Sequence, residues 1–281
     1  MDFRARSVKE YYQTIESRLC YRYLLNGSQH FGYYPDGDAT IGESQAQRMH
    51  HDLLVALLDL PTASIVLDVG CGQGVVSADI ASRYGLRVVG IDIVPCILKK
   101  AHRRKNSNWK LAQLLDFKEM SYNNIEFPDN NFDGVYTIET LSHSPDLDRS
   151  IEELCRVLRT GGKMVLFEYK VAAISAFSKQ ENEMRLLIKN GAAMHSLERF
   201  RGDNFRNLLA ETGLRNITET NISSNTLPSL RRLYRVLRYP YILVNKFGWH
   251  QHFTNTTAAV EYYKMARKGL LEYFVYTAVK N

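Results

Sequence analysis

Apolar and polar positions alternate in blocks along most of this chain. From residue 64 onward, short apolar runs are separated by stretches whose apolar residues recur at helical spacing. This order is typical of a parallel sheet, because each buried strand is followed by a helix that crosses over to the next strand. The runs predict strands at 65–69, 86–91, 109–115, 132–138 and 163–169. We therefore expect an α/β fold.

The connection between the last two of these strands carries the clearest helical pattern. Its apolar side chains recur every three or four residues, at Leu147, Ile151, Leu154 and Leu158. Gly161 and Gly162 follow, and glycine often ends a helix because it adopts the left-handed conformation without strain. The pattern predicts that the helix ends at these glycines.

Beyond residue 169 the alternation becomes irregular. The pattern predicts a helix at 179–200, a helix at 205–211 capped by Asp203 and Asn204, and strands near 217–222 and 273–276. About fifty residues separate those two strands, which is more than a connection needs, so we expect a helical cover over one end of the sheet. Residues 1–52 are helical in pattern and then rich in tyrosine and glycine. We expect them to form a lid at the same end.

Composition and charge narrow the class of protein. A chain of 281 residues corresponds to one large domain or two small ones. Lys and Arg outnumber Asp and Glu by 36 to 30, but nine of the basic residues lie in two windows without acids, 99–105 and 231–238. The remaining 27 basic residues face 30 acidic ones, which argues against a nucleic-acid-binding surface.

The cysteines and the apolar runs indicate the compartment. Four widely spaced cysteines show no pairing at metal-ligand spacing, which favours a reduced, intracellular protein without a metal site. No apolar run approaches the ~18 residues that a membrane-spanning helix needs. The first six residues have mixed charge and no apolar signal segment. The sequence thus predicts a cytoplasmic protein.

The most specific chemical signal is a glycine-rich loop directly after the first predicted strand. It runs from Asp68 through Val69-Gly70-Cys71-Gly72-Gln73 to Gly74 and leads into a helical pattern. Glycines at 70, 72 and 74 let backbone N–H groups lie against a ligand. Asp92 ends the second apolar run, where an acid can accept both hydroxyls of a ribose. Val75 stands where a dinucleotide loop would have glycine, which disfavours NAD.

This loop resembles motif I of the class I S-adenosylmethionine-dependent methyltransferases. The similarity continues through Asp92 and Asp116-Phe117, and then through 127–136 and 156–163, so that it spans about residues 65 to 169. It implies a Rossmann-like, seven-stranded, mostly parallel sheet with one reversed strand near the C-terminus and helices on both faces. We accordingly expect an N-terminal lid at 1–52, a core at 53–221, an inserted helical cover at 222–269 and a last core strand at 270–281.

The resemblance also implies S-adenosyl-L-methionine as the cofactor. Asp92 is then expected to bind the ribose, Asp116 the adenine amine, and the backbone of 70–74 the methionyl part. The residues expected around the cofactor are Asp68, Gly70, Cys71, Gly72, Gly74, Asp92, Ile93, Asp116, Phe117, Glu139, Tyr21 and Tyr33.

Further segments resemble the sterol C-24 and tocopherol methyltransferases. Residues 138–145 read Ile-Glu-Thr-Leu-Ser-His-Ser-Pro, residues 167–169 read Phe-Glu-Tyr, and residues 30–34 are similar to the segment with which both groups cover the cofactor. The C-terminal part differs from the sterol enzymes, whereas terpenoid C-methyltransferases of secondary metabolism share the pattern. The resemblance implies methyl transfer to an alkene of a prenylated or terpenoid small molecule, through a carbocation that is quenched or cyclises.

Side chains for this chemistry are expected at the carboxyl ends of the strands. Aromatic rings before the core, Tyr21 among them, can stabilise a cation, and Glu139, His143 or Glu168 can orient the acceptor or remove a proton. One rival interpretation is an O- or N-methyltransferase with His143 or Glu139 as general base. Another is a cofactor-binding protein without catalysis.

The expected partner is a hydrophobic small-molecule acceptor. In the cover, Leu230, Leu233, Tyr234 and Leu237 fall on one side of a predicted helix, and four arginines of 231–238 fall on the other. The basic side admits three interpretations: a solvated face, a transient contact with a membrane surface, or a contact between subunits of a homo-oligomer.

Overall fold

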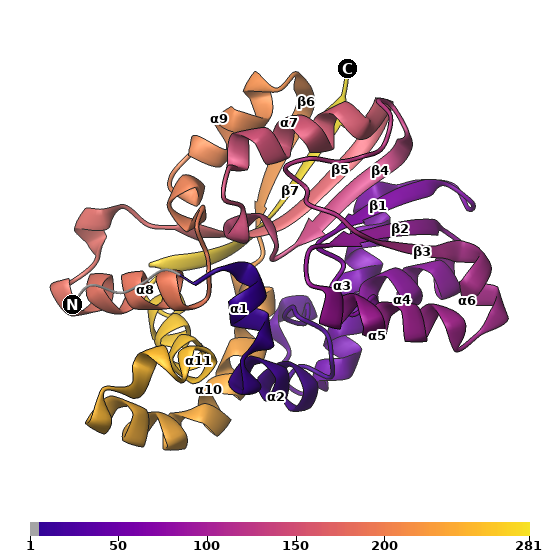
Figure 1. Cartoon of the computed structure of the whole chain (residues 1–281). Helices are drawn as coiled ribbons and strands as arrows, with labels where there is room; N and C mark the ends of the chain where they lie inside the picture. Colours follow the sequence, from indigo (N-terminus) through magenta and orange to yellow (C-terminus); the bar gives the residue numbers. More distant parts are fainter. Residues whose placement is uncertain (1–5) are drawn as a thin grey trace.

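The computed structural model describes residues 6–281, and its centre is a seven-stranded sheet (Figure 1). The strand order is β3-β2-β1-β4-β5-β7-β6, and β7 runs antiparallel to both of its neighbours. This confirms the predicted Rossmann-like sheet with one reversed strand. The strands are β1 (Ile65–Val69), β2 (Arg87–Asp92), β3 (Leu115–Glu119), β4 (Phe132–Ile138), β5 (Leu158–Val171), β6 (Leu214–Asn221) and β7 (Leu271–Lys280).

The predicted strand at 109–115 is wrong. Trp109–Leu114 forms helix α6, and β3 begins only at Leu115. The side chain of Asn108 accepts a hydrogen bond from the Lys110 N–H at 2.9 Å and so caps the start of the helix. Leu115 and Phe117, which are both buried, are the alternating positions that β3 turns toward the core.

The predicted end of the helix at Gly161 and Gly162 is also wrong. Helix α7 (Leu147–Val157) ends earlier, and Leu158 already pairs with Phe132 as part of β5. The Lys280 ammonium donates to the carbonyl oxygens of Arg156 and Leu158 at 3.1 and 2.7 Å. These carbonyls, left free where the helix ends, therefore have a partner without a glycine cap.

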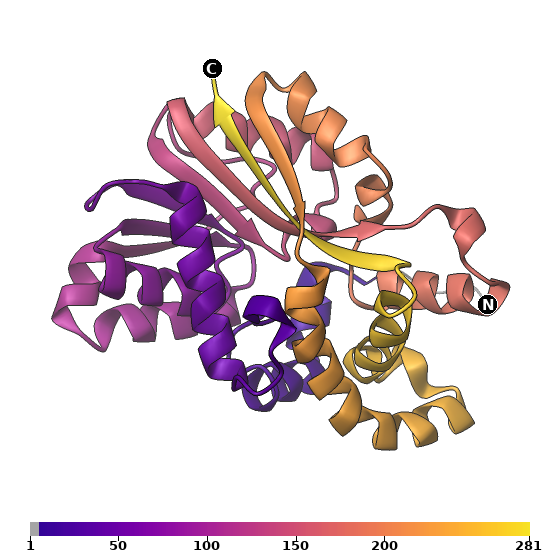
Figure 2. The same cartoon turned by 180° about the vertical axis from the view of Figure 1, so that it is seen from behind.

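Two apolar layers cover the two faces of the sheet. Helices α3 (Glu43–Leu58), α4 (Val75–Tyr84), α5 (Pro95–Asn106) and α6 lie on one face, and α7 and α9 (Asn204–Glu211) lie on the other (Figure 1, Figure 2). Side chains alternate between the layers, so that Val66 packs in the first and Leu67 in the second. The first layer continues past the end of the sheet into the lid and the cover.

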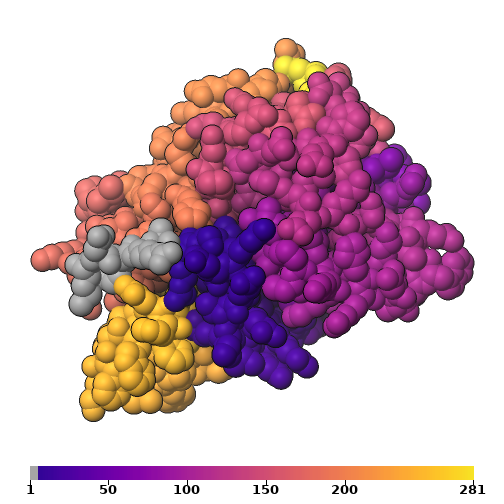
Figure 3. All heavy atoms as spheres, in the orientation of Figure 1, coloured from indigo at the N-terminus to yellow at the C-terminus, as the bar shows by residue number. Residues whose placement is uncertain are grey.

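Helices from both ends of the chain enclose the carboxyl end of the parallel strands. They are α1 (Val8–Gln13), α2 (Ile15–Tyr23), α8 (Lys179–Gly191), α10 (Ser223–Phe247) and α11 (Thr254–Ala266). The N-terminal helices, in indigo, lie between the gold cover and the magenta core (Figure 3). The Glu16 carboxylate accepts hydrogen bonds from the N–H groups of Asn255 and Thr256, at 3.0 and 2.7 Å, and thereby caps α11 from α2.

One predicted border falls inside a helix, and one predicted helix is shorter than expected. The expected border between lid and core at residue 52 falls inside α3, and the first five residues of the lid lie outside the described residues. The expected helix at 179–200 ends at Gly191, and a short 3-10 turn follows at Leu197–Phe200. In residues 6–281, no helix is both long and apolar enough to pass through a bilayer.

Candidate active site

The glycine loop between β1 and α4 requires glycine at each of its three predicted positions. Gly70, Gly72 and Gly74 have φ angles of +74°, +54° and +67°. A Cβ would collide with Thr140 at position 70, with Gln29 at position 72, and with Phe117 at position 74. The N–H groups of Gly70 and Cys71 both donate to the Ile91 carbonyl, at 2.8 and 3.0 Å, which ties the loop to β2. The loop is thus held open toward the end of the sheet.

Asp92 stands at the end of β2, beside this loop. Its carboxylate accepts hydrogen bonds from the N–H groups of Gly72, at 3.0 Å, and Val94, at 2.8 Å. Burial raises the pKa of Asp92 to about 6, although these backbone donors favour the ionised form. Asp92 and Ile93 edge a crevice of about 470 Å³ that Gly70, Tyr122 and Ile138 also line.

A second crevice, of about 370 Å³, opens on the other side of the loop. Asp68 and Cys71 line it, together with Gln73 and the lid residues Ser28 and His30. The Asp68 carboxylate accepts a hydrogen bond of 2.5 Å from the Ser77 hydroxyl, which ties β1 to the first turn of α4. Burial raises the pKa of Asp68 to about 6. Of the expected loop residues, Gly70 and Cys71 line these crevices, while Gly72 and Gly74 shape the loop behind them.

The structure separates three expected cofactor residues from these crevices. Asp116 lies in the middle of β3, where its carboxylate pairs with Lys105 at 3.1 Å. Phe117 is buried behind Gly74, and Tyr33 packs on α3, where its N–H donates to the Ala46 carbonyl at 2.9 Å. None of the three lines the crevices. Asp116 is the second residue of β3, and the carboxyl end of this strand comes later, at Glu119.

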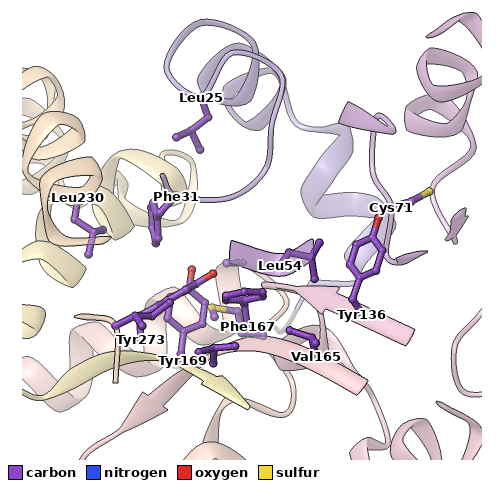
Figure 4. Close-up of a cluster of buried hydrophobic side chains, with 14 of the residues drawn as sticks. Leu25, Phe31, Leu54, Cys71, Tyr136, Val165, Phe167, Tyr169, Leu230 and Tyr273 are labelled. Atoms are coloured by element: carbon purple, nitrogen blue, oxygen red, sulfur yellow. The ribbon is translucent and has the colours of Figure 1, made fainter. Parts of the chain in front are cut away.

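An elongated cavity of about 790 Å³ adjoins the first crevice. Aromatic and aliphatic side chains dominate its lining, and Figure 4 shows Phe31, Tyr169 and Leu230 from three different parts of the chain around this space. Helices α1, α2, α8, α10 and α11 supply most of the remaining wall, and within the described part of the chain no Lys or Arg lines it. Tyr12, Gln29, Glu139 and His143 line both the cavity and the crevice, so the two spaces meet at these side chains.

Glu139 lies at this junction in a left-handed conformation, with φ +54°. Its carboxylate accepts three hydrogen bonds: from the Tyr169 hydroxyl at 2.7 Å, the Tyr273 hydroxyl at 3.0 Å and the Phe31 N–H at 3.0 Å. Burial raises the pKa of Glu139 to about 7, despite these donors. The side chain therefore links the last strands to the lid and borders both spaces, as a site residue must.

His143 lies opposite and is held as a neutral imidazole. Burial lowers its pKa to about 4. Its Nδ1 lies 3.1 Å from the Ala193 carbonyl, which can only accept, so Nδ1 carries the proton. The Nε2 lone pair then faces the Tyr12 hydroxyl at 3.4 Å. The ring thus presents a weak base at the junction.

Glu168 does not lie where the prediction of a catalytic role requires. Its side chain is fully buried, and Oε1 accepts hydrogen bonds from the N–H groups of Thr140 and Leu141, at 2.8 and 2.6 Å. It lines neither the cavity nor the crevices. Burial raises its pKa to about 8, and Oε2 has no hydrogen-bond partner. Glu168 holds the turn after β4 and is better described as a structural carboxyl group.

Tyr21 lines the cavity as part of a hydrogen-bonded group at its wall. The hydroxyls of Tyr11 and Tyr21 are 2.9 Å apart, and the Tyr11 hydroxyl donates to the Asn255 side chain at 2.6 Å. Tyr12, another of the rings expected before the core, lines the cavity too, whereas sequence reasoning missed Gln29, Tyr122 and Asn255 as lining residues. Tyr122 could have been found had the end of β3 been placed correctly, whereas Asn255 carries no local signal.

These residues fit an S-adenosyl cofactor. The positive φ angles at the loop let its backbone approach a ligand closely, and Asp92 supplies an acceptor at the end of the neighbouring strand. Among residues 6–281, no group of three or more His, Cys, Asp or Glu side chains is arranged to hold a metal ion. The fold and the loop together define a class I S-adenosylmethionine-dependent methyltransferase.

Comparison with known proteins agrees with this class. Residues 67–166 match the family model described as a methyltransferase domain. The chain is 31% identical over 264 residues to the S-adenosyl-L-methionine-dependent Diels-Alderase iccD of Talaromyces variabilis, covering 92% of this chain and 90% of that protein. It is 29% identical over 192 residues to a sterol 24-C-methyltransferase of Aspergillus fumigatus, covering 68% of this chain and 50% of that protein.

Two solved structures share the fold across nearly the whole chain. The crystal structure of the 4+2 cyclase SpnF has a TM-score of 0.78 at 20% identity and covers 100% of this chain and 99% of its own. Geranyl diphosphate C-methyltransferase from Streptomyces coelicolor has a TM-score of 0.74 at 17% identity, with coverage of 98% and 96%. The chain therefore belongs to the S-adenosylmethionine-dependent methyltransferase family, and S-adenosyl-L-methionine is its cofactor.

Proposed function

We propose that this enzyme transfers a methyl group to an alkene carbon of a neutral prenylated or terpenoid small molecule. The observation that carries the proposal is the large apolar cavity that opens onto the cofactor crevice at Glu139 and His143. No Lys or Arg of residues 6–281 lines it, so an acceptor with a diphosphate group would lack a charge partner among these residues. Relatives that act on sterols and a fold neighbour that binds geranyl diphosphate support the terpenoid class.

The bound cofactor would supply an electrophilic methyl group, and the residues of this chain would control what happens to the acceptor. The alkene electron pair forms the new C–C bond while the electrons of the C–S bond remain on sulfur, which leaves a carbocation on the acceptor. The rings of Tyr12, Tyr21 and Tyr169 line the cavity and can stabilise this charge by about 2 kcal/mol each when desolvated. The apolar side chains exclude water that would trap the cation.

His143 is the base that the proposal assigns to the end of the reaction. Its Nε2 atom faces one hydroxyl group, that of Tyr12, at the long distance of 3.4 Å, whereas the Glu139 carboxylate accepts three shorter hydrogen bonds. A base with a pKa of about 4 can accept a proton from a carbon next to a cation, because that proton is strongly acidic. A base with so low a pKa is too weak to deprotonate a hydroxyl group efficiently. This contrast favours C-methylation over O-methylation.

The test uses purified enzyme, methyl-labelled S-adenosylmethionine and matched neutral and diphosphorylated prenyl acceptors. We expect S-adenosylhomocysteine and a labelled product only with neutral acceptors, with the label on carbon by NMR. A His143→Ala variant should keep its cofactor affinity and accumulate cyclised or water-trapped products instead of the alkene product. A label on oxygen or nitrogen would refute the proposal, and so would a preference for the diphosphate.

A second candidate function is cyclisation without methyl transfer. The resemblance over 92% of the chain to a protein named as a Diels-Alderase favours it, and so does the shared fold with a 4+2 cyclase. The bound cofactor would then complete the wall of the cavity beside Glu139. The same incubation separates the two functions, because a cyclase yields a product isomeric with its substrate and no S-adenosylhomocysteine.

A contact between the outer face of α10 and a partner stays a prediction. The inner face of this helix lines the acceptor cavity through Leu230, Leu233 and Leu237. The outer face exposes Tyr239 and Phe247 along with Arg231, Arg235 and Arg238, so it is not a purely polar surface. Arg232 turns inward instead and pairs with the buried Glu43 at 3.0 Å. Both a membrane contact and a subunit contact remain open proposals for it.

A further inference from the structure

Three histidines are buried together between the lid and α3. His30 belongs to the lid, and His50 and His51 belong to α3, and all three are nearly or fully inaccessible. The ring centroid of His30 lies 5.0 Å from that of His50 and 5.2 Å from that of His51. His30 also lines the crevice beside the glycine loop. The cluster therefore forms part of the cofactor-side wall.

The hydrogen bonds of this cluster contain one more proton than two neutral imidazoles supply. His30 Nδ1 lies 2.8 Å from the Phe31 carbonyl, so this nitrogen donates and its Nε2 carries a lone pair if the ring is neutral. His51 Nδ1 lies 2.7 Å from an Asp79 carboxylate oxygen, so it also donates. The two Nε2 atoms face each other at 3.1 Å. A hydrogen bond between them needs an additional proton.

The surrounding charges locate that proton on His51. Burial, together with the neighbouring imidazoles, lowers the pKa of His30, and burial lowers that of His50 to about 4. Burial would raise the pKa of Asp79, but hydrogen bonds and charge from His51 and Arg83 lower it, so Asp79 is ionised. Two titratable or charged groups, His50 and Asp79, face the pair directly. Asp52, Arg83 and Tyr84 face it through Asp79, and Asp68 and Cys71 face it through the crevice.

Residues 30–32 of the lid connect the histidine pair to the active site. The Phe31 carbonyl accepts from both His30 and His50, and the Phe31 N–H donates to Glu139 at 3.0 Å. The Gly32 N–H donates to the Ser229 hydroxyl at 2.9 Å, which adds α10 to the network. A displacement of residues 30–32 would therefore change the wall of the cofactor crevice and the position of the Glu139 carboxylate together.

We propose that His30 and His51 share one proton, balanced by Asp79, and that this charged pair positions the lid over the cofactor. Loss of the proton would leave two lone pairs facing each other, which would release His30 from α3. Because the clamped lid holds the proton, cofactor affinity should fall at high pH, where that proton is lost. His51 and Asp79 are thus positioning residues. The proposal holds for any acceptor.

The first test reads the proton directly in the full-length protein. With ¹⁵N-labelled histidine, NMR at pH 7 should show both ring nitrogens of His51 protonated, and a His51→Gln variant should assign the signals. His50 should show a neutral ring in the same spectrum. A neutral His51 at pH 7 would overturn the proposal.

The second test measures S-adenosylhomocysteine affinity by calorimetry between pH 6.5 and 9. An Asp79→Asn variant should bind about tenfold more weakly at pH 7 and lose the decline at high pH. Asp52→Asn is the matched control, because Asp52 pairs with Arg83 but does not contact His51. Asp79→Glu should restore part of the affinity. Asp92 and Glu139 are present in the wild type and in every variant, so the effect of their titration on the affinity cancels in the comparison. Equal effects of Asp79→Asn and Asp52→Asn would refute the role.

Discussion

The cofactor crevice and the acceptor cavity meet at Glu139 and His143, but the chain builds them in different ways. The floor of the crevices is the loop between β1 and α4 with the end of β2, a short stretch of sequence, and residues of the lid and of the turn after β4 complete their walls. The cavity is lined by α1, α2, α8, α10 and α11, which come from both ends of the chain. One region is set by a local motif and the other by how distant helices pack.

The largest expected effect comes from the loop. In Gly70→Ala the new Cβ would collide with Thr140 at a φ angle of +74°, and we expect cofactor affinity to fall about a hundredfold, ~3 kcal/mol. Calorimetric titration with S-adenosylhomocysteine measures this. The control is Gly42→Ala, because Gly42 has a φ of −71° and open space around its Cβ position. If both variants bind like the wild type, the loop does not form the cofactor site.

The next effect separates two aspartates on neighbouring strands, Asp92 at the end of β2 and Asp116 near the start of β3. Asp92→Ala removes the acceptor at the end of β2 and should weaken cofactor binding at least tenfold, by about 1.4 kcal/mol. Asp116→Ala should change the affinity less than about twofold, because Asp116 pairs with Lys105 away from the crevice. A large loss in Asp116→Ala would restore the role that the sequence suggested for it.

A substitution on α10 tests whether the cavity is independent of the crevice. Leu233→Trp should fill part of the cavity and reduce acceptor turnover about tenfold, with cofactor affinity within twofold of the wild type. Val236→Trp, on the exposed side of the same helix, is the matched control and should turn over normally. Equal turnover in the two variants would contradict our assignment of the acceptor site.

The last test concerns stability rather than binding, through the buried carboxyl group of Glu168. Burial raises its pKa to about 8 in the folded protein, above the ordinary value of ~4.3, so the folded state holds a proton that the unfolded state has lost. Stability should therefore fall as the pH rises from about 4.5 to 8, by at most about 1.4 kcal/mol per pH unit from this group. Glu168→Gln should flatten this decline in urea-unfolding measurements. An unchanged slope would show that Glu168 is ionised when folded.

The sequence predicted best what depends on local residues. Gly70 and Asp92 were found because a loop after a strand and an acid after the next strand form a pattern within a few turns of chain. Asp116 was misplaced because 109–115 is apolar enough for a strand, yet Asn108 caps a helix there. Glu168 shows a different limit: a carboxylate at the end of a strand can serve catalysis or hold a turn, and only the N–H donors of Thr140 and Leu141 decide.

The cavity was predictable only as a region. The tyrosines before the core were expected near the acceptor, and Tyr21 lies there, but Asn255 enters through contacts with Tyr11 and Glu16 that join residues more than 200 positions apart. Such contacts arise from packing of helices that share no sequence pattern. The charge on the histidine cluster could not be predicted from the sequence either, because it follows from three distances between side chains.

The cap that Glu16 places on α11 has a kinetic consequence. Because one carboxylate on α2 satisfies two backbone N–H groups at the start of α11, the N-terminal helices cannot swing away without uncovering the beginning of the other helix. Acceptor entry and product release would then depend on a single opening event. Such coupling favours compulsory-order turnover, in which the nucleoside arrives first and leaves last.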